Sequence, residues 1–221
     1  MTRIQLLVAT TNPGKLREIR DLLADIPVAL LGLADMPPIE EPEETGATFE
    51  ENARLKALYY DAHLFRREPD GAAMTVAEDS GLVIDALDGE PGVHSARFLR
   101  GDASYAERFA EIFRRLAERP SQPRTARFVC AVAVVDEGRL VYETTGTVEG
   151  EIARAPRGTG GFGYDPIFYY PPYGSTLADV TQEEKIRVAH RGIAFRKLAA
   201  WLELRLRRPR EWPVQAKNGE R

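Results

Sequence analysis

The sequence predicts an α/β fold built on a mixed β-sheet, and three observations support this prediction. Strand-like and helical patterns alternate in the first part of the chain, as in parallel βαβ units. A hairpin signature at Asp136-Glu137-Gly138 follows later and indicates antiparallel strands. No repeat or linker-like stretch divides the 221 residues. We therefore expect one domain over residues 1–206 and a flexible tail over residues 207–221.

Hydrophobic spacing predicts the elements of the first half. Short apolar runs indicate strands at 4–9, 28–33, 74–77 and 82–86. Helical spacing indicates helices at 14–23 and 48–67. Thr48 and Glu51 form a capping box at the start of the second helix, each accepting from the other's backbone. Pro69-Asp70-Gly71 reads as a turn, and Glu78-Asp79-Ser80-Gly81 is expected to close a strand.

The second half combines an amphipathic helix with a long hairpin. The helix is expected at 105–117, where Phe109, Ile112 and Leu116 share one face. Strands at 127–135 and 140–148 flank the hairpin turn. The remaining elements are expected to be a glycine-rich loop at 158–163, a short strand at 167–170, and helix from about 182 with a break near His190.

Composition excludes several classes of function. The net charge of −4 and the pI of about 5.6 do not favour nucleic-acid binding. The single Cys130 excludes an internal disulfide and a cysteine-based zinc site. The first apolar run is too short for a signal peptide, and no apolar stretch approaches the roughly 18 residues of a membrane span. We expect a cytoplasmic protein that binds neither nucleic acid nor membrane.

The first candidate site is the junction between the first strand and the first helix, Thr10-Thr11-Asn12-Pro13-Gly14-Lys15. Backbone N–H groups at a helix start and one ammonium group favour a phosphate. A Walker loop is excluded, because Ala9 and Leu16 stand where that motif needs Gly and Ser or Thr. A plain turn that starts a helix stays open as an equal alternative.

The glycine-rich segment Gly158-Thr159-Gly160-Gly161-Phe162-Gly163 formally matches a dinucleotide-binding pattern. That function is rejected, because Tyr164-Asp165-Pro166 follows where the pattern requires a helix. The segment is interpreted as a loop in which Phe162 or Tyr164 stacks on a base, with a surface loop as the alternative.

Acidic residues form a second candidate site. Glu78 and Asp79 are adjacent, and alternation along a strand implies that both cannot be core residues. One carboxylate could hold a divalent cation and the other accept a proton from water. Glu43 and Glu44 are candidates for further oxygen ligands of Mg²⁺. The alternatives are a turn at 78–81 and a solvated acidic loop at 40–44.

A basic cluster near the C-terminus is the third candidate. Lys185 and Arg191 could bind phosphate, one as a point charge and the other through its planar fork. His190 lies beside them and has no metal-binding spacing to another His. An exposed basic helix end is the alternative interpretation.

Together these segments resemble the inosine triphosphate pyrophosphatase family. The resemblance rests on blocks in the family's order: ATTNPGK at 9–15, ETG at 44–46, TFEENA at 48–53, KA at 56–57, EDSGL at 78–82, PGVHSARF at 91–98, GTGGFGYDPIF at 158–168, EEK at 183–185 and HRG at 190–192. It implies an elongated mixed sheet with flanking helices, two lobes around a nucleotide cleft, and a homodimer. It also implies Mg²⁺-dependent hydrolysis of ITP, dITP and XTP to the monophosphate and pyrophosphate.

The resemblance also implies a role for each candidate residue. Asp79 would be the general base and a metal ligand, with further ligands among Glu43, Glu44 and Glu78. The residues expected to bind the nucleoside triphosphate are Thr10, Thr11, Asn12, Pro13, Gly14, Lys15, Ser80, Phe162, Gly163, Tyr164, Asp165, Lys185, His190 and Arg191. Two other functions stay open: a pyrophosphatase for pyrimidine or modified triphosphates, and a nucleotide-binding module without catalysis.

Overall fold

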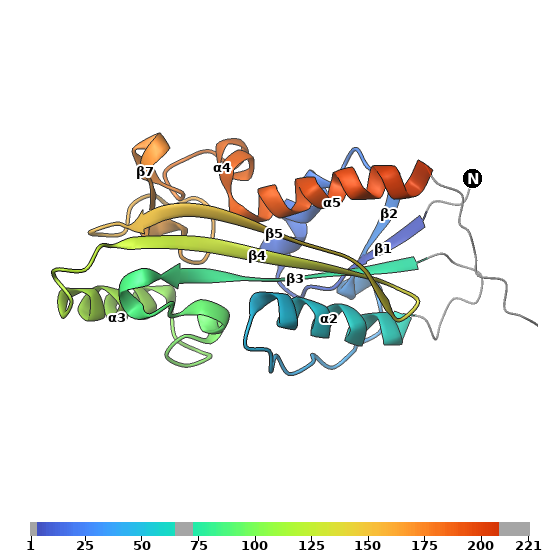
Figure 1. Ribbon diagram of the computed structural model, residues 1–221, viewed down its shortest axis with the longest axis horizontal. Coiled ribbons are helices and arrows are strands. Elements are labelled where there is room, and N and C mark those ends of the chain that lie inside the picture. Colours follow the sequence, from blue (N-terminus) through green and yellow to red (C-terminus); the bar gives the residue numbers. More distant parts are fainter. Residues whose placement is uncertain (1–3, 65–72, 208–221) are drawn as a thin grey trace, which may run out of the picture.

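The protein folds around one seven-stranded mixed sheet with the strand order β2-β1-β3-β4-β5-β6-β7 (Figure 1). The computed structural model describes residues 4–64 and 73–207. The strands are β1 (Ile4–Val8), β2 (Val28–Gly32), β3 (Ala73–Ile84), β4 (Thr125–Asp136), β5 (Arg139–Ile152), β6 (Phe168–Tyr170) and β7 (Ser175–Thr176). The α-helices are α1 (Pro13–Leu22), α2 (Phe49–Leu64), α3 (Tyr105–Ala117), α4 (Gln182–Val188) and α5 (His190–Arg207). The predicted α/β class with a mixed sheet is confirmed.

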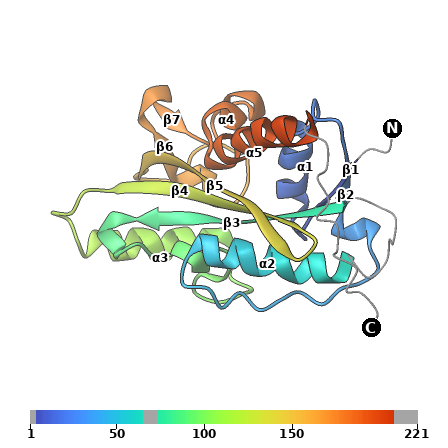
Figure 2. The same ribbon diagram turned by 45° about the vertical axis from the view of Figure 1, so that its right-hand side comes forward.

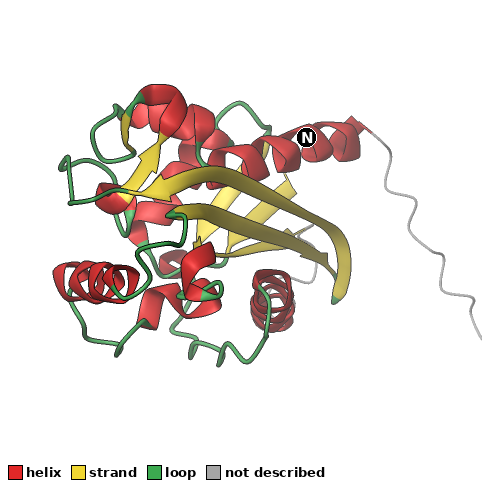
Figure 3. Ribbon diagram, turned by 60° about the vertical axis from the view of Figure 1, so that its left-hand side comes forward, coloured by secondary structure: helices red, strands yellow, loops and turns green. Residues whose placement is uncertain are grey.

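The sheet is parallel at one end and antiparallel over the rest. β1 pairs in parallel with both β2 and β3, and each later neighbour is antiparallel. The predicted hairpin joins β4 to β5, and Glu137 and Gly138 adopt φ values of 54° and 73°. Two consecutive positive φ values are typical of the tight turn that matches the twist of a hairpin. Figure 3 shows how strongly this long hairpin curves along its length.

Strand β3 differs in two ways from what the sequence predicts. The strand does not close at Glu78-Asp79-Ser80-Gly81 but runs through these residues, paired with β4 from Met74 opposite Asp136 to Ile84 opposite Ala126. Both carboxylate residues are buried, Glu78 being 4% and Asp79 6% exposed. Two adjacent strand residues can both be buried when helices cover both faces of a sheet and supply cations to each.

Helices α2 and α5 lie on opposite sides of the long strands (Figures 1 and 2). On the α2 side, Ala53 and Ala57 pack against Ala77, Ala131 and Ala133 of β3 and β4. Small residues on both elements allow this helix to approach the sheet closely. On the other side, α5 packs Phe195, Leu198 and Leu202 in a cluster that also includes side chains of β1, α1, β3 and β4.

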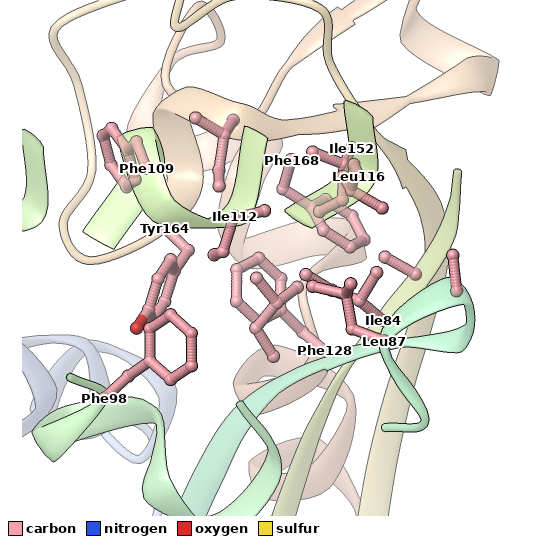
Figure 4. Close-up of a cluster of buried hydrophobic side chains, with 14 of the residues drawn as sticks. Ile84, Leu87, Phe98, Phe109, Ile112, Leu116, Phe128, Ile152, Tyr164 and Phe168 are labelled. Atoms are coloured by element: carbon pink, nitrogen blue, oxygen red, sulfur yellow. The ribbon is translucent and has the colours of Figure 1, made fainter. Parts of the chain in front are cut away.

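A third cluster lies at the far end of the sheet and contains most of the aromatic core. Phe109, Ile112 and Leu116 of α3 pack there with Phe128 of β4 and Phe168 of β6 (Figure 4). The helix has the predicted bounds and the predicted apolar face. Glu78 and Ser80 of β3 lie between Val76 of the α5 cluster and Leu82 of this third cluster.

The helical predictions near the C-terminus hold. The helical path is interrupted between α4 and α5 at Ala189, beside His190 as predicted.

The predicted capping box at the start of α2 forms only in part. Thr48 accepts from the Glu51 N–H, but the Glu51 carboxylate accepts from the Ala47 N–H rather than from the Thr48 N–H. Residues 65–67 of the predicted helix, the 69–71 turn and the tail at 208–221 lie outside the described residues. Within the described residues, no helix combines the length and apolar character that a membrane span requires.

The contact between β5 and α5 depends on a residue without a side chain. A Cβ on Gly146 would lie 2.2 Å from the His190 carbonyl oxygen and 2.6 Å from the Ala194 nitrogen. We expect Gly146→Ala to lower the free energy of unfolding by about 1–3 kcal/mol, because backbone has to move to relieve the overlap. Urea denaturation measures this change. Gly101→Ala is the control, since a Cβ there has no heavy atom within 4 Å. Equal stability of the two variants would contradict the inference.

Candidate functional site

The site begins with an interruption in an apolar row of β3. Met74, Val76 and Leu82 are buried hydrophobic residues on one face of this strand. Glu78 and Ser80 occupy the two intervening positions of the same face, since side chains on a strand alternate. A buried polar stretch in such a row costs stability unless every group has partners. The partners of Glu78 and Ser80 come from α1, α5 and β4.

A polar cavity of about 600 Å³ lies beside this stretch. Its walls combine the predicted phosphate turn, the acidic loop, part of α2 and the segment just before Phe98. The lining residues are Ala9, Thr10, Thr11, Asn12, Lys15, Glu41, Pro42, Glu43, Glu44, Lys56, Tyr60, Glu78, Ala96 and Arg97. This volume falls within the range of ordinary ligand pockets.

A smaller and more apolar cavity of about 90 Å³ shares Asn12, Lys15 and Ala96 with the first. Its other lining residues are Ser80, Gly81, Ser95, Tyr105, Phe128, Phe162, Gly163, Tyr164, Asp165, Lys185, His190 and Arg191. The two cavities therefore meet at the start of α1. One is rich in charge and the other in aromatic rings.

The turn before α1 caps its own helix. Asn12 is the N-cap residue, and its Oδ1 accepts from the N–H groups of Gly14 at 2.9 Å and Lys15 at 3.1 Å. The Thr10 hydroxyl accepts from the Asn12 N–H. The two helical N–H groups expected to face a phosphate thus already have a partner within the turn. The Lys15 ammonium points toward β3 and lies 2.8 Å from Glu78 Oε1.

Lys56 of α2 joins two carboxylates from different elements. Its Nζ lies 2.5 Å from Glu44 Oε1 and 3.2 Å from Asp79 Oδ1. Asn52 donates to Asp79 Oδ2, and Arg97 donates to Glu44 Oε2. Asn52 and Lys56 are four residues apart on a helix, so they face the sheet together.

Burial and charge act in opposite directions on these two acids. Burial raises the pKa of Asp79 above its usual value, and Lys56 only partly offsets this effect. Burial also favours protonation of Glu44, but Lys56 and Arg97 bring its pKa below the usual value. The environments of Asp79 and Glu44 thus shift their pKa values in opposite directions.

Glu78 points to the other face of the sheet and has a different environment. Its carboxylate contacts Lys15 and Arg191, and the Cys130 thiol donates to it at 3.0 Å. Although burial favours the protonated form, Arg191 and Lys15 hold the pKa of Glu78 well below its usual value. Adjacent carboxylates on β3 thus differ in basicity because different cations face them.

Glu18 of α1 organises the predicted basic cluster. One of its oxygens is 2.9 Å from Lys185 Nζ and the other is 2.7 Å from Arg191 Nη1. Lys185 also contacts Asp165 at 2.8 Å, and Arg191 donates to the Ser80 hydroxyl at 3.1 Å. All of these charged groups are buried, and each of the two predicted cations is already paired with a carboxylate of the protein.

Aromatic rings complete the smaller cavity. Lys185 Nζ lies 4.4 Å from the centre of the Phe162 ring, and the Arg191 guanidinium carbon lies 5.3 Å from it. The His190 ring stacks on Phe128 with their centres 4.8 Å apart. Burial lowers the pKa of His190 well below its usual value, with the Arg191 charge adding to the effect, so the imidazole is neutral. Tyr164 donates to the Ser95 carbonyl.

The structure brings most of the predicted residues together. Thr10, Thr11, Glu43, Glu44 and Glu78 line the larger cavity. The predicted residues of the smaller cavity are Ser80, Phe162, Gly163, Tyr164, Asp165, Lys185, His190 and Arg191. Asn12 and Lys15 line both cavities. Pro13, Gly14 and Asp79 line neither cavity as the described residues define them, although Asp79 contacts Lys56 in the wall of the larger one.

Sequence reasoning assigned no role to four residues of the site: Glu18, Asn52, Lys56 and Arg97. Helical spacing was the available signal for three of them. Glu18 follows Lys15 by three residues, and Asn52 and Lys56 are four apart, so each pair shares a helix face. Arg97 lies in the motif block at 91–98, but no spacing signal pointed to its partner Glu44, which is 53 residues away.

The donor set for a metal ion is limited to two convergent acids. Within residues 4–64 and 73–207, no group of three or more His, Cys, Asp or Glu side chains is arranged to hold a metal ion. Glu44 and Asp79 converge on a single ammonium, whereas Glu78 is directed to the other face and Glu43 lies on the cavity wall. Two carboxylates together with substrate oxygens are a usual ligand set for Mg²⁺, so the Glu44–Asp79 pair fits that ion.

Comparison with known proteins finds relatives over most of the chain. Residues 6–201 match the Ham1 family. A dITP/XTP pyrophosphatase of Geobacillus kaustophilus is 45% identical over 201 residues, which are 90% of this chain and 95% of the relative. A dITP/XTP pyrophosphatase of Geobacter sulfurreducens is 46% identical over 195 residues, which are 88% of this chain and 94% of the relative.

Solved structures give the same result for the fold. A HAM1 protein from Coxiella burnetii has a TM-score of 0.80 at 36% identity, covering 91% of this chain and 99% of its own. A nucleoside-triphosphatase, or dITP/XTP pyrophosphatase, from Mycobacterium abscessus has a TM-score of 0.68 at 43% identity, and the match covers 90% of this chain and 99% of that protein's chain. The resemblance identified from the sequence motifs is confirmed. This chain belongs to the Ham1 family.

Proposed function

We propose that this protein hydrolyses ITP, dITP and XTP to the nucleoside monophosphate and pyrophosphate, and so removes non-standard purines from the nucleotide pool. The observation that carries the proposal is the junction of two unlike cavities at Asn12 and Lys15. The polar cavity suits a triphosphate, and the aromatic one suits a base. The relatives at 45% and 46% identity are named dITP/XTP pyrophosphatases, which supports the proposal.

Asp79 is the proposed general base. Its carboxylate accepts a proton from water as the water oxygen bonds to the α-phosphorus, and the bond to the oxygen bridging the α and β phosphates breaks to release pyrophosphate. The environments of β3 support this choice over Glu78, because Asp79 has the raised pKa and Glu78 the lowered one. Separation of two neighbouring carboxyl groups in this way is typical of acid–base assignments in active sites.

Glu44 and Asp79 are the proposed ligands of Mg²⁺. When bound, the ion would offset negative charge on the phosphates and on the leaving pyrophosphate. The chain contributes its own cations nearby: Lys15, Lys56 and Arg97 line the polar cavity. These groups would orient the triphosphate and increase the positive field at oxygens that gain charge in the transition state.

Base selection is assigned to the smaller cavity. Phe162 offers an aromatic surface for the ring, and the buried cations Lys185 and Arg191 lie beside it. Hypoxanthine and xanthine carry a 6-oxo group where adenine carries an amino group. A site that donates to this oxygen would leave its donors unpaired against adenine, which is costly in a buried pocket.

A substrate panel tests the proposal directly. Pyrophosphate release is measured with ITP, dITP, XTP, ATP, GTP, dTTP and UTP in the presence of Mg²⁺. We expect the three non-standard purine substrates to react much faster than the others. Equal rates on ATP, GTP and ITP would contradict the proposed specificity, and faster release from dTTP or UTP would favour a pyrimidine pyrophosphatase. Tight ITP binding without turnover would indicate a non-catalytic binding module.

The proposed activity also suggests where and how the protein works. Free nucleoside triphosphates are the substrate, so we propose the cytoplasm as its compartment. A homodimer, implied by the resemblance stated above, stays a prediction that size measurement in solution would test.

A further inference from the structure

Each carboxylate oxygen of the two proposed metal ligands accepts one hydrogen bond from a neighbouring side chain. Glu44 Oε1 accepts from Lys56, and Glu44 Oε2 accepts from Arg97 at 2.9 Å. Asp79 Oδ1 accepts from Lys56, and Asp79 Oδ2 accepts from Asn52, each at 3.2 Å. A cation that bridged Glu44 Oε1 and Asp79 Oδ1 would take the place of the Lys56 ammonium, which contacts both of these oxygens.

We propose that Lys56 holds the position between Glu44 and Asp79 that a divalent cation needs, and releases it only when a triphosphate offers the ammonium other oxygens. Metal alone would then bind poorly, and metal would bind well together with nucleotide. The inference rests on the proposed function for the identity of the nucleotide, but the place-holding role of Lys56 rests on its contacts with the two acids. Lys56 is therefore a positioning residue, because it acts on the metal through Glu44 and Asp79.

The contacts of Lys56 support this role over that of a simple structural ion pair. Its side chain is 14% exposed and forms part of the polar cavity wall, so the ammonium borders both the carboxylates and the cavity. Lysine carries one compact charge on a flexible stem with three rotatable donors. The ammonium can thus turn from the carboxylates to oxygens in the cavity by a rotamer change, without movement of α2.

Electrostatics explains why the exchange would depend on the nucleotide. With Lys56 between them, the two carboxylates are already neutralised in part, and an added divalent cation would be repelled by the ammonium. A triphosphate in the cavity supplies negative oxygens near Lys56, Lys15 and Arg97. It therefore stabilises the ammonium away from the carboxylates, and by linkage metal and nucleotide increase each other's affinity.

Mn²⁺ alone, in place of Mg²⁺, is the probe for the test. Its binding to the full chain without nucleotide is followed by calorimetry and by electron paramagnetic resonance, for the wild type and for Lys56→Gln. We expect Lys56→Gln to bind Mn²⁺ at least about tenfold more tightly than the wild type, within the range usual for coupled sites. Arg54→Gln is the matched control. It lies two residues away on α2 and removes an exposed cation from Glu143, so its Mn²⁺ affinity should equal that of the wild type.

Two results would overturn the proposal. One is a folded Lys56→Gln protein that binds Mn²⁺ no more tightly than the wild type. The other needs no variant: wild-type protein that binds Mn²⁺ as tightly without nucleotide as with an ITP analogue that carries an imido link between the α and β phosphates. Neither readout depends on turnover. A substrate panel that failed while Lys56→Gln gained Mn²⁺ affinity would reject the proposed function and keep the place-holding role.

Discussion

Asp79→Asn is expected to reduce pyrophosphate release from ITP by at least about 10²–10⁴-fold, the usual contribution of a positioned general base. The amide has nearly the shape of the carboxylate but cannot take a proton from water. It also loses the charge that faces Lys56. Steady-state assays with ITP measure the loss, and calorimetry with the uncleavable analogue shows whether nucleotide binding persists.

A suitable control for Asp79→Asn lies at the end of the same strand. Asp85 directly follows β3 and pairs with Arg127 on the surface, and neither residue lines the two cavities as described. Asp85→Asn should leave turnover close to that of the wild type. If Asp79→Asn also stayed near the wild-type rate while folded, the assignment of Asp79 as the base would be wrong.

Glu18→Gln is expected to lower the free energy of unfolding by about 3–5 kcal/mol at neutral pH, the usual cost of removing one partner from a buried ion pair. Glu18 contacts both Lys185 and Arg191, and the side chains of all three are less than a tenth exposed. The neutral amide would leave two buried cations with less compensating charge. Urea denaturation at several pH values measures the effect.

The pH dependence of this loss has a defined direction. Burial favours protonation of Glu18, but Arg191 and Lys185 outweigh it and hold its pKa below the usual value of 4.5. A lowered pKa in the folded state stabilises the protein above the unfolded value and ceases to do so as pH falls through the folded value. The difference between wild type and Glu18→Gln should therefore be largest near neutral pH and shrink below about pH 4.5.

The control for Glu18→Gln is an acidic residue of the same kind in an exposed pair. Glu183 contacts Arg187 on the surface of α4, and exposed pairs of this kind contribute about 0–1 kcal/mol. Glu183→Gln should therefore change stability by less than about 1 kcal/mol at every pH. A Glu18→Gln loss that is equally small, or that does not depend on pH, would show that the Glu18 network does not stabilise the fold as inferred.

Local signals explain which parts of the fold could be predicted from the sequence. The α3 bounds, the hairpin turn at 137–138 and the break before His190 all depend on side-chain spacing or turn residues within a few positions. The strand expected to stop at Glu78 does not, because local turn propensity was weighed without the partner strand. Pairing with β4 along the whole length of β3 outweighs that propensity.

In the candidate site, too, local motifs could be predicted from the sequence and long-range contacts could not. Motif blocks identified the phosphate turn, the acidic residues, the glycine-rich loop and the late basic residues, and thereby the family. They did not reveal that each predicted cation faces a carboxylate: Lys15 faces Glu78, Lys185 faces Glu18 and Asp165, and Arg191 faces Glu18 and Glu78. These partners are brought together because α1 and α5 pack on the sheet and α4 packs against α5.

The sequence by itself thus determined the fold class, most element bounds, the family and most of the residues around the two cavities. Only the tertiary structure decided which carboxylate faces which cation, and through this the unlike basicities of Glu78 and Asp79 and the position of Lys56 between two acids. The physical reason is distance along the chain: Lys185 contacts Glu18 across 167 positions. Such pairs depend on how whole elements pack, and neighbouring residues carry no information about that packing.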